Sequence, residues 1–284
     1  MMKKSLLAVL LGLMVLLAAA CGSAEEDASV ETEENATAEA TEENAEQNNE
    51  GEAEVNDDTV YTVATDNGYV PFEYIDEETG ELVGFDIDLI NALAEEAGIN
   101  IELQAMKFDG VVAGIGSGRF DIGIAGMTIT EDRKENIDFT QPYYEAGLIV
   151  GVKADNEEIK SVDDLDGKTV ATRTGSTSET YIKENTNATP ESFPQITEAY
   201  QNVIAGRADA VIYDLPNVQY YASKEAGGKL KTVGETLTGE EYGIAFPKGS
   251  ELRDPIDEAL TTLKENGTYG DLYEKWFGER PEGM

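Results

Sequence analysis

Histidine is absent from this 284-residue chain, and cysteine and tryptophan occur once each. Because the single Cys lies near the N-terminus, in an apolar segment, only carboxylates, Lys and Tyr remain for proton transfer in a folded cleft. A lone Cys also excludes an intramolecular disulfide. These absences weigh against an enzyme and against a domain held together by disulfides.

Positive charge is scarce as well: 20 Lys and Arg accompany 58 Asp and Glu, and the net charge is -38. A basic surface is the usual footprint of a nucleic-acid-binding protein, so we expect no nucleic-acid partner. Residues 22–58 alone hold fifteen Asp and Glu, with no Lys, Arg or aromatic residue. This composition predicts a disordered acidic tether, since it cannot bury enough apolar surface to order itself. A polyacidic tail that binds a partner is the alternative interpretation.

The start of the chain has the pattern of a secretion signal: a positively charged end, the apolar run Leu6–Leu17 and then three alanines. The run is too short for a comfortable membrane span. The alanines lead directly into Cys21, which resembles the lipobox of bacterial lipoproteins, although Ala18 stands where a lipobox usually has Leu. We therefore expect residues 1–21 to be a lipoprotein signal peptide ending at a lipidated Cys21, whose acyl chains anchor the protein to a membrane face. Simple secretion with an incidental Cys is the alternative.

A duplicated phrase organises the remaining chain. Gly118–Asp121 and Gly206–Asp209 both read Gly-Arg-x-Asp, and each follows an apolar stretch of helical spacing and precedes an apolar run of strand length. A Gly just past a helix takes the left-handed conformation that ends it, so each copy predicts an αβ step in a parallel sheet. Two distant copies predict two similar α/β lobes. Ordinary turn chemistry repeated by chance is the alternative.

The predicted strands also indicate where a ligand would bind. In open α/β sheets ligands bind beyond the carboxyl ends of the strands. Ala125–Thr128 and Tyr213–Asp214 follow or end the two repeated strands. We therefore expect these two segments to face one another across a cleft.

Further elements can be assigned from periodicity. Val60–Ala64 predicts a strand, and apolar spacing predicts an amphipathic helix at about residues 86–97. A second set of strand and helix units runs from near residue 161 to residue 233. The chain then returns to a closing helix at about residues 255–265 and a last amphipathic piece that ends at Trp276-Phe277. If these final elements pack on the first lobe, the chain crosses between the lobes twice, and two crossings make a hinge.

Six segments occur in the order and spacing of the polar amino-acid-binding receptors of ABC importers, solute-binding protein family 3, which this chain resembles. They are Ala64–Asp66, Val70–Glu73, Val83–Asp88, Ala125–Thr130 with Arg133, Asp138-Phe139, and Tyr242–Gly249. Within that family, Leu252-Arg253, Glu265–Tyr269 and Lys275–Gly278 make the chain most similar to glutamine-binding proteins. The resemblance implies a periplasmic-binding-protein fold of the second type, in which two α/β lobes close on an amino acid without catalytic turnover.

The resemblance also implies boundaries for these lobes. Residues 59–142 and 243–284 would form lobe 1, and residues 148–237 would form lobe 2. The two hinge crossings would lie at residues 143–147 and 238–242.

Two residues correspond to the anchors with which the family holds a zwitterion. Arg133 carries a planar fork that suits a carboxylate, and Asp214 suits an ammonium. A dry cleft can hold both charges only if each meets an opposite charge and hydrogen bonds. Position alone would favour a surface salt bridge from Arg133 to Glu131 or Asp132, and the surrounding motif reverses that preference.

Further ligand contacts follow from the same resemblance. They are backbone groups at Gly126 and Thr128, the amide near Thr177, and three aromatic walls, Tyr69, Phe72 and Phe108. Thr177 opens a predicted helix, and a helix N-terminus favours an anion. Taken singly, each aromatic residue is expected in the core, Phe72 most of all.

The end of the pocket that would receive the ligand side chain is expected to contain Asp66 and Arg173, with Tyr213 nearby. One acceptor and one cation suit a glutamine carboxamide, which has both a donor and an acceptor. An arginine or lysine ligand would meet like charge at Arg173, and a glutamate ligand would meet it at Asp66. Glutamine receptors have Lys in place of Arg173 and His in place of Tyr213, so the amino acid itself stays open.

We therefore expect an extracytoplasmic receptor, lipid-anchored to a bacterial cell membrane, that captures a polar amino acid and delivers it to an ABC permease. Glutamine is the favoured ligand. No cofactor or metal is expected, and the protein is expected to be a monomer. Two alternatives stay open: an amino-acid sensor module for a membrane receptor, and an enzyme like cyclohexadienyl dehydratase on the same fold.

Overall fold

The structure, a computed structural model, describes residues 59–281. The predicted signal peptide, Cys21 and the acidic segment of residues 22–58 lie outside the described residues.

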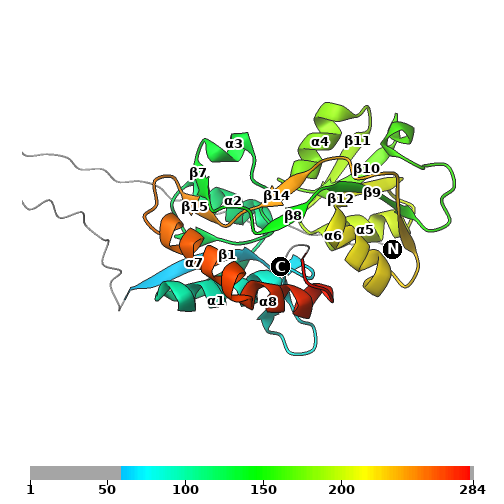
Figure 1. Cartoon of the computed structure of the whole chain (residues 1–284). Coiled ribbons are helices and arrows are strands. Elements are labelled where there is room, and N and C mark those ends of the chain that lie inside the picture. Colours follow the sequence, from blue (N-terminus) through cyan, green and yellow to red (C-terminus); the bar gives the residue numbers. More distant parts are fainter. Residues whose placement is uncertain (1–58, 282–284) are drawn as a thin grey trace, which may run out of the picture. The chain divides into compact units, whose positions relative to one another are not determined.

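Two five-stranded sheets organise the described part (Figure 1). In the first sheet β5, β1 and β6 run parallel, and β15 lies antiparallel between β6 and β7. Its strands, in spatial order, are β5 (Asn100–Met106), β1 (Val60–Asp66), β6 (Ile122–Gly123), β15 (Ala245–Pro247) and β7 (Ile137–Phe139).

In the second sheet β11, β10 and β12 run parallel, and β9 is antiparallel to both of its neighbours. Its strands, in spatial order, are β11 (Thr189–Phe193), β10 (Thr169–Arg173), β12 (Ala210–Asp214), β9 (Leu148–Lys153) and β13 (Leu230–Val233). Every residue of β12 is buried, as expected for a central strand that is covered on both faces.

Helices cover both sheets. With the first sheet lie α1 (Phe85–Ala97), α2 (Phe108–Gly116), α3 (Glu131–Lys134), α7 (Arg253–Asn266) and α8 (Thr268–Phe277). With the second lie α4 (Thr177–Asn185), α5 (Ile196–Ile204), α6 (Leu215–Tyr220), the short 3-10 turn η1 (Val162–Leu165) and the π-helical turn η2 (Tyr221–Glu225). The first sheet with its helices is called lobe 1, and the second with its helices lobe 2.

The helix predicted at residues 86–97 is confirmed as α1. It begins one residue earlier, at Phe85, and buries Ile87, Ile90 and Leu93 on one face, as the apolar spacing requires. Its end is set by Gly98, whose φ of 66° is left-handed and whose N–H bonds back to the last turn.

Both copies of the Gly-Arg-x-Asp phrase form the predicted helix, Gly stop and strand. Gly118 and Gly206 have φ angles of 69° and 72°, and the strands that follow, β6 and β12, pair in parallel with β1 and β10. The first strand is shorter than its apolar run predicts. It ends at Gly123, and the chain turns at Gly126, where φ is 52°.

The C-terminal elements return to lobe 1. β15 enters the first sheet, α7 packs on α1, and α8 packs on both α7 and α1 (Figure 1). The chain therefore passes between the sheets twice, and the predicted two-lobe α/β fold with two crossings is confirmed.

Two small sheets complete the fold. β8 (Tyr144–Ala146) and β14 (Glu240–Tyr242) pair antiparallel, and each stands in a segment that joins the two large sheets. The other small sheet is an antiparallel set of β2 (Gly68–Tyr69), β3 (Glu73–Ile75) and β4 (Leu82–Val83). It follows β1 directly and carries aromatic residues toward the second lobe.

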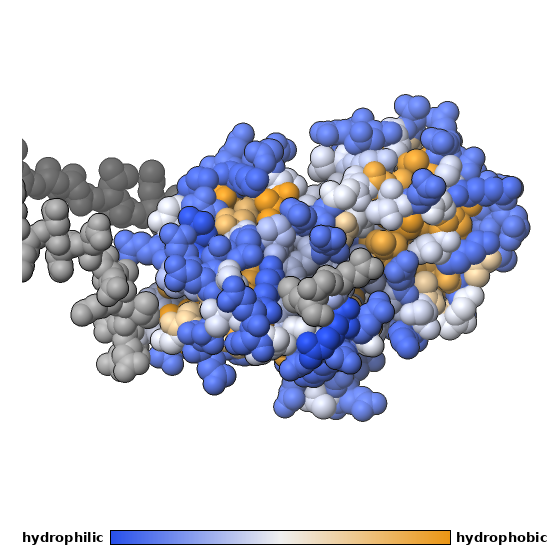
Figure 2. Space-filling model, viewed as in Figure 1, coloured by the Kyte–Doolittle hydropathy of each residue, from blue (hydrophilic) through white to orange (hydrophobic). Residues whose placement is uncertain are grey.

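Buried side chains connect the lobes as well as filling them. One apolar cluster includes Phe85 of α1, Tyr69 of β2 and Tyr213 of β12. Tyr69 contacts Tyr213 edge to face, with 5.9 Å between ring centroids. The face seen in Figure 2 is mostly hydrophilic, with separate apolar patches between the hydrophilic regions.

Candidate functional site

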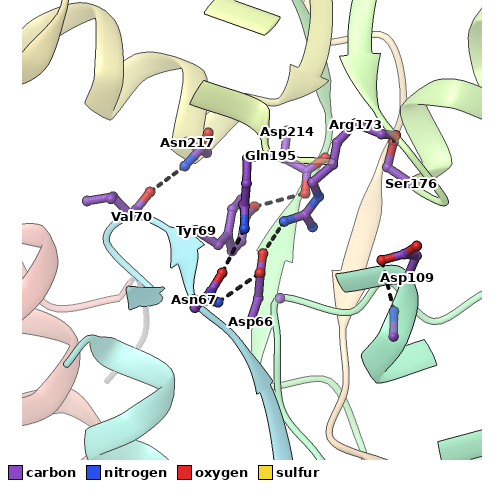
Figure 3. Close-up of polar contacts among 12 residues, drawn as sticks. Asp66, Asn67, Tyr69, Val70, Asp109, Arg173, Ser176, Gln195, Asp214 and Asn217 are labelled. Atoms are coloured by element: carbon purple, nitrogen blue, oxygen red, sulfur yellow. Dashed lines mark hydrogen bonds and ion pairs between the residues drawn. The ribbon is translucent and has the colours of Figure 1, made fainter. Parts of the chain in front are cut away.

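The carboxyl ends of parallel strands from both lobes meet at one place. Asp66 ends β1, Arg173 ends β10, and Asp214 ends β12. The three side chains lie close together in Figure 3, with Tyr69 beside them. This is the position at which open α/β sheets bind ligands.

Asp66 and Arg173 form an ion pair that crosses from lobe 1 to lobe 2. Both side chains are buried: Asp66 is 0% exposed and Arg173 is 2% exposed. Burial raises the pKa of Asp66, and Arg173 opposes that rise. Burial also works against the charge of Arg173, but surrounding acidic groups, Asp66 and Asp214 among them, outweigh it and raise its pKa. The pair therefore keeps a buried cation at the inner end of the cleft.

Aromatic rings surround this cation. The guanidinium carbon of Arg173 lies 4.3 Å from the ring centroid of Phe108, and 5.2 Å from the centroids of Tyr69 and Tyr213. Rings at such distances attract a cation through their negative faces. The aromatic residues predicted at the site therefore enclose a side chain of the protein itself.

Asp214 is held by two tyrosine hydroxyls. Tyr69 donates a hydrogen bond of 2.8 Å to its carboxylate, and Tyr242 donates a second one. Burial raises the pKa of Asp214, while these two hydrogen bonds, Arg173 and Arg133 all lower it. Donors and cations on several sides are what a buried carboxylate needs to stay charged.

Arg133 lies at the outer end of the cleft, in the short helix α3. Thr130 caps this helix by accepting a hydrogen bond of 3.2 Å from the Arg133 backbone. The guanidinium donates to the carbonyl oxygen of Thr128 at 2.7 Å and to that of Gly175, in the other lobe, at 3.3 Å. Its carbon lies 5.3 Å from the ring centroid of Phe108. Arg133 therefore bridges the two lobes through backbone groups.

The electrostatics of Arg133 favour an anion. Burial lowers its pKa to about 10, and Asp214 and Glu240 act against that shift, so it stays positive at neutral pH. The alternative salt bridge to Glu131 or Asp132 does not form among residues 59–281. Glu131 pairs with Lys134 instead, at 2.8 Å.

The backbone predicted to meet the ligand is partly used within the protein. The N–H of Gly126 donates to Asp86 at 2.9 Å, so this donor is already used within the protein. The Thr128 and Thr177 hydroxyls donate to the same oxygen of Glu240, at 2.8 Å and 3.0 Å. Thr177 is the first residue of α4, so its own N–H belongs to the helix N-terminus, as predicted.

Phe72 lies behind the other aromatic residues. It is fully buried and stacks on Tyr69 with 5.0 Å between centroids, and its other ring contacts include Phe85, Tyr144 and Phe277. Phe72 also packs against Tyr242, so any influence on a ligand would be transmitted through Tyr69 or Tyr242.

Several contributors were missed by the sequence reasoning. Tyr242 lies within a segment on which the family resemblance depended, yet its hydroxyl contact with Asp214 had no signal in the sequence. Glu240 stands just before that segment. Asp86 lies in the Gly-Phe-Asp-Ile-Asp phrase, and its contact with the Gly126 backbone is visible only in three dimensions.

Neutral contacts also join the lobes beside the charged groups (Figure 3). Gln195 of lobe 2 donates to the Asn67 side chain at 2.7 Å. Asn217 donates to the Val70 carbonyl oxygen and is itself held by the Tyr200 hydroxyl. The lobes are therefore in contact across the cleft, and cavities such as one of about 310 Å³ beside Arg133 lie at its mouth.

Two further observations concern residues 59–281 only. No helix there is both long and apolar enough to cross a bilayer. No three or more His, Cys, Asp or Glu side chains gather there as metal ligands would.

The sequence matches the model of the bacterial extracellular solute-binding proteins, family 3, over residues 61–279. It is 32% identical over 281 residues to the L-cystine-binding protein TcyA of Bacillus subtilis, with 98% of each chain covered.

Two solved structures are similar in fold and sequence. An ancestral arginine-binding protein bound to glutamine is 45% identical, with a TM-score of 0.73 over 78% of this chain and 98% of that one. The GluR0 ligand-binding core from Nostoc punctiforme, in complex with L-glutamate, is 40% identical, with a TM-score of 0.71 over 76% of this chain and 99% of that one.

Proposed function

We propose that this chain, which belongs to the bacterial extracellular solute-binding proteins of family 3, captures glutamine by closing its two lobes around it. As a member of that family it is an amino-acid-binding protein that works with an ABC permease. The choice of glutamine is our proposal, since the similar proteins are described as binding cystine, arginine, glutamine or glutamate.

The observation that carries the proposal is a pair of opposite charges on the two lobes. Arg133 of lobe 1 and Asp214 of lobe 2 interact electrostatically, and each shifts the pKa of the other toward its charged form. The carboxylate and ammonium of an amino acid fit between such groups, because each then meets opposite charge in a dry cleft. The carbonyl oxygen of Gly126 and the N-terminus of α4 at Thr177 would supply further hydrogen bonds.

The inner end of the cleft supports a neutral amide side chain. Asp66 offers an acceptor and Arg173 offers donors, and a carboxamide has one group for each. A glutamate ligand would bring a second carboxylate to Asp66, and a lysine ligand a second cation to Arg173, with little water to screen either. Tyr69 and Phe108 would cover the aliphatic stem between the two ends.

Closure needs a hinge, and we assign it to the pairing of β8 with β14. Residues 143–147 and 238–242 contain these strands and join residues 59–142 and 243–284, as lobe 1, to residues 148–237, as lobe 2. Movement at two short crossings would separate Arg133 from Asp214 and open the cleft.

The location of the protein is also proposed. Homologues are extracytoplasmic, and a lipid on Cys21 would hold the protein at the outer face of the cell membrane, with residues 22–58 as the spacer. A monomer with no cofactor is expected to be sufficient for capture, with the permease as its partner.

Calorimetric titration of the full chain with a panel of amino acids, together with Arg133→Ala and Asp214→Ala, tests the proposal. Glutamine should bind most tightly to the wild type. Each hydrogen bond to a charged group contributes about 1.5 to 3 kcal/mol, so each variant should lose about tenfold or more in affinity. Arg119→Ala is the matched control, since Arg119 is exposed and contacts Phe120 away from the cleft. Anchor variants with affinities within a few-fold of wild type would end the assignment.

A sensor module is the second candidate, favoured by the similarity to the GluR0 ligand-binding core. It would use the same cleft and the same anchors. Reconstitution with amino-acid ABC transporters of its own organism would distinguish the two, because the receptor of an importer stimulates the ATPase activity of its transporter when ligand is added and a sensor module does not.

A further inference from the structure

We infer that the Arg173 side chain fills a site that could otherwise bind the basic side chain of a ligand. It thereby excludes amino acids with cationic side chains from the cleft. This inference deepens the proposed function, on which its ligand-binding predictions rest. It predicts that the protein rejects amino acids with cationic side chains and would bind them after substitution of Arg173.

The surroundings of Arg173 are a complete guanidinium site. A carboxylate, Asp66, pairs with the cation, and the rings of Phe108, Tyr69 and Tyr213 lie within 5.2 Å of its central carbon. A carboxylate with aromatic faces around it is the chemistry that recognises guanidinium and ammonium groups. The site is also dry, because Arg173 is only 2% exposed.

Most of the site lies in the lobe opposite to Arg173, and only Tyr213 of β12 shares lobe 2 with it. Asp66, Tyr69 and Phe108 belong to lobe 1, whereas Arg173 enters from the end of β10 in lobe 2. Closure therefore delivers a guanidinium from the protein to the place where the end of a long basic ligand would lie. Such a ligand would either displace Arg173 or meet its charge without water between them.

A ligand with a neutral side chain need not displace Arg173 and is not repelled by its charge. Arg173 Nε and the Tyr213 hydroxyl are buried without hydrogen-bond partners among residues 59–281. Both can donate, so a carbonyl oxygen of a ligand could accept from them while the Asp66–Arg173 ion pair stays intact. The pair thus excludes cations and still leaves donors for a carboxamide.

The test is Arg173→Ser in the full chain, titrated by calorimetry with L-arginine and L-citrulline. Citrulline is the matched ligand, since it has nearly the shape of arginine without the charge. Wild type should not prefer arginine over citrulline. Arg173→Ser leaves Asp66 and three rings without a cation, so arginine binding should rise by about tenfold or more and exceed that of citrulline. Adding Asp66→Asn to Arg173→Ser should abolish the preference for arginine.

A second probe does not need the amino-acid anchors. Methylguanidinium chloride should raise the melting temperature of Arg173→Ser, and it should leave the wild type and Arg119→Ser unchanged. This measurement separates the inference from the proposed function, because it holds even if no amino acid binds. Arg173→Leu, which keeps most of the side-chain volume, replaces Arg173→Ser for the arginine titration if the serine variant does not fold.

The inference is wrong if a folded Arg173 variant that still binds amino acids binds arginine no better than wild type does. It is equally wrong if the variant binds arginine and citrulline alike and methylguanidinium leaves its melting temperature unchanged. If no amino acid binds, the proposed function fails, and the methylguanidinium measurement alone decides the inference.

Discussion

Two groups of buried acids lie near the β2 loop, and only one of them is paired with a cation. Asp66, on the cleft side, is bound to Arg173. Glu73 of β3 and Asp86 of α1, behind the loop, are fully buried with no Lys or Arg paired to them among residues 59–281. The same residue class is thus buried in two different ways within one small region.

The two groups of acids differ in their protonation. Asp66 and Arg173 retain charge, because each compensates the other. Burial raises the pKa of Glu73 well above its ordinary value, and raises that of Asp86 to about 6. Both Glu73 oxygens and Asp86 Oδ1 lack a donor among the described residues, so a proton held between the two acids is the group that can satisfy them. The pair of acids therefore retains a proton, which Glu73 holds more tightly than Asp86 does.

The difference follows from what each group does. Asp66 faces the cleft, where we propose that charge selects a ligand. Asp86 accepts hydrogen bonds from the Gly126 N–H at 2.9 Å and the Tyr143 hydroxyl at 2.8 Å, so it holds the loop that we propose to face the ligand and the start of a proposed hinge segment. Positioning of this kind depends on the hydrogen bonds that Asp86 accepts, without a Lys or Arg partner.

The largest expected effect comes from removing only one partner of the Asp66–Arg173 ion pair. Asp66→Ala leaves Arg173 as an uncompensated buried cation, which should destabilise the ligand-free protein by about 3–5 kcal/mol. Urea unfolding followed by circular dichroism measures this. Glu73→Gln is the matched control behind the loop and should not destabilise the protein, since no bare charge is left. Equal losses for both variants would contradict the contrast between the two groups.

The pH dependence of stability tests the protonated group. Because folding raises the pKa of Asp86 from 3.8 to about 6, the folded state binds the proton more tightly, and this stabilisation is lost as pH rises from about 4 through about 6. The contribution is about 3 kcal/mol, and the raised pKa of Glu73 extends the loss to higher pH. Urea midpoints at pH 4, 5, 6 and 7 should fall less steeply for Glu73→Gln with Asp86→Asn than for wild type. Parallel curves would mean that these acids do not carry the protons.

The smallest expected effect concerns the uncharged contacts between the lobes. Gln195→Ala and Asn217→Ala each remove one hydrogen bond that exists only when the lobes are together, worth about 1 kcal/mol. Affinity should fall about fivefold for every amino acid that binds, with their order unchanged, as measured by calorimetry. Asn202→Ala is the control, since Asn202 bonds only within lobe 2 in the described part. A change in ligand preference would show that these amides contact the ligand.

Much of the fold could be predicted because it depends on short spacings. The apolar face of α1 and the left-handed glycines at 118 and 206 each involve residues a few positions apart. Such patterns are set by helix and turn geometry, whatever surrounds them. The same reasoning failed on the length of β6, because the turn at Gly126 is tied to Asp86, far away in the sequence.

The residues of the candidate site could be proposed from the sequence, but the contacts among them could not. Arg133, Asp214 and Arg173 were identifiable from motifs and repeats. That the aromatic walls enclose the guanidinium of Arg173 was not, and neither was the pairing of Asp214 with the hydroxyl of Tyr242. Side-chain partners of this kind depend on how the two lobes meet.

The sequence by itself therefore determined the elements, the two α/β lobes and the kinds of charge available in the cleft, since local periodicity and residue type carry that information. Only the tertiary structure decided which acid keeps a charge and which keeps a proton. Asp66 and Arg173 are 107 positions apart, and no local pattern connects them. Burial makes the choice, because an acid removed from water stays ionised only where the fold brings it a cation or enough donors.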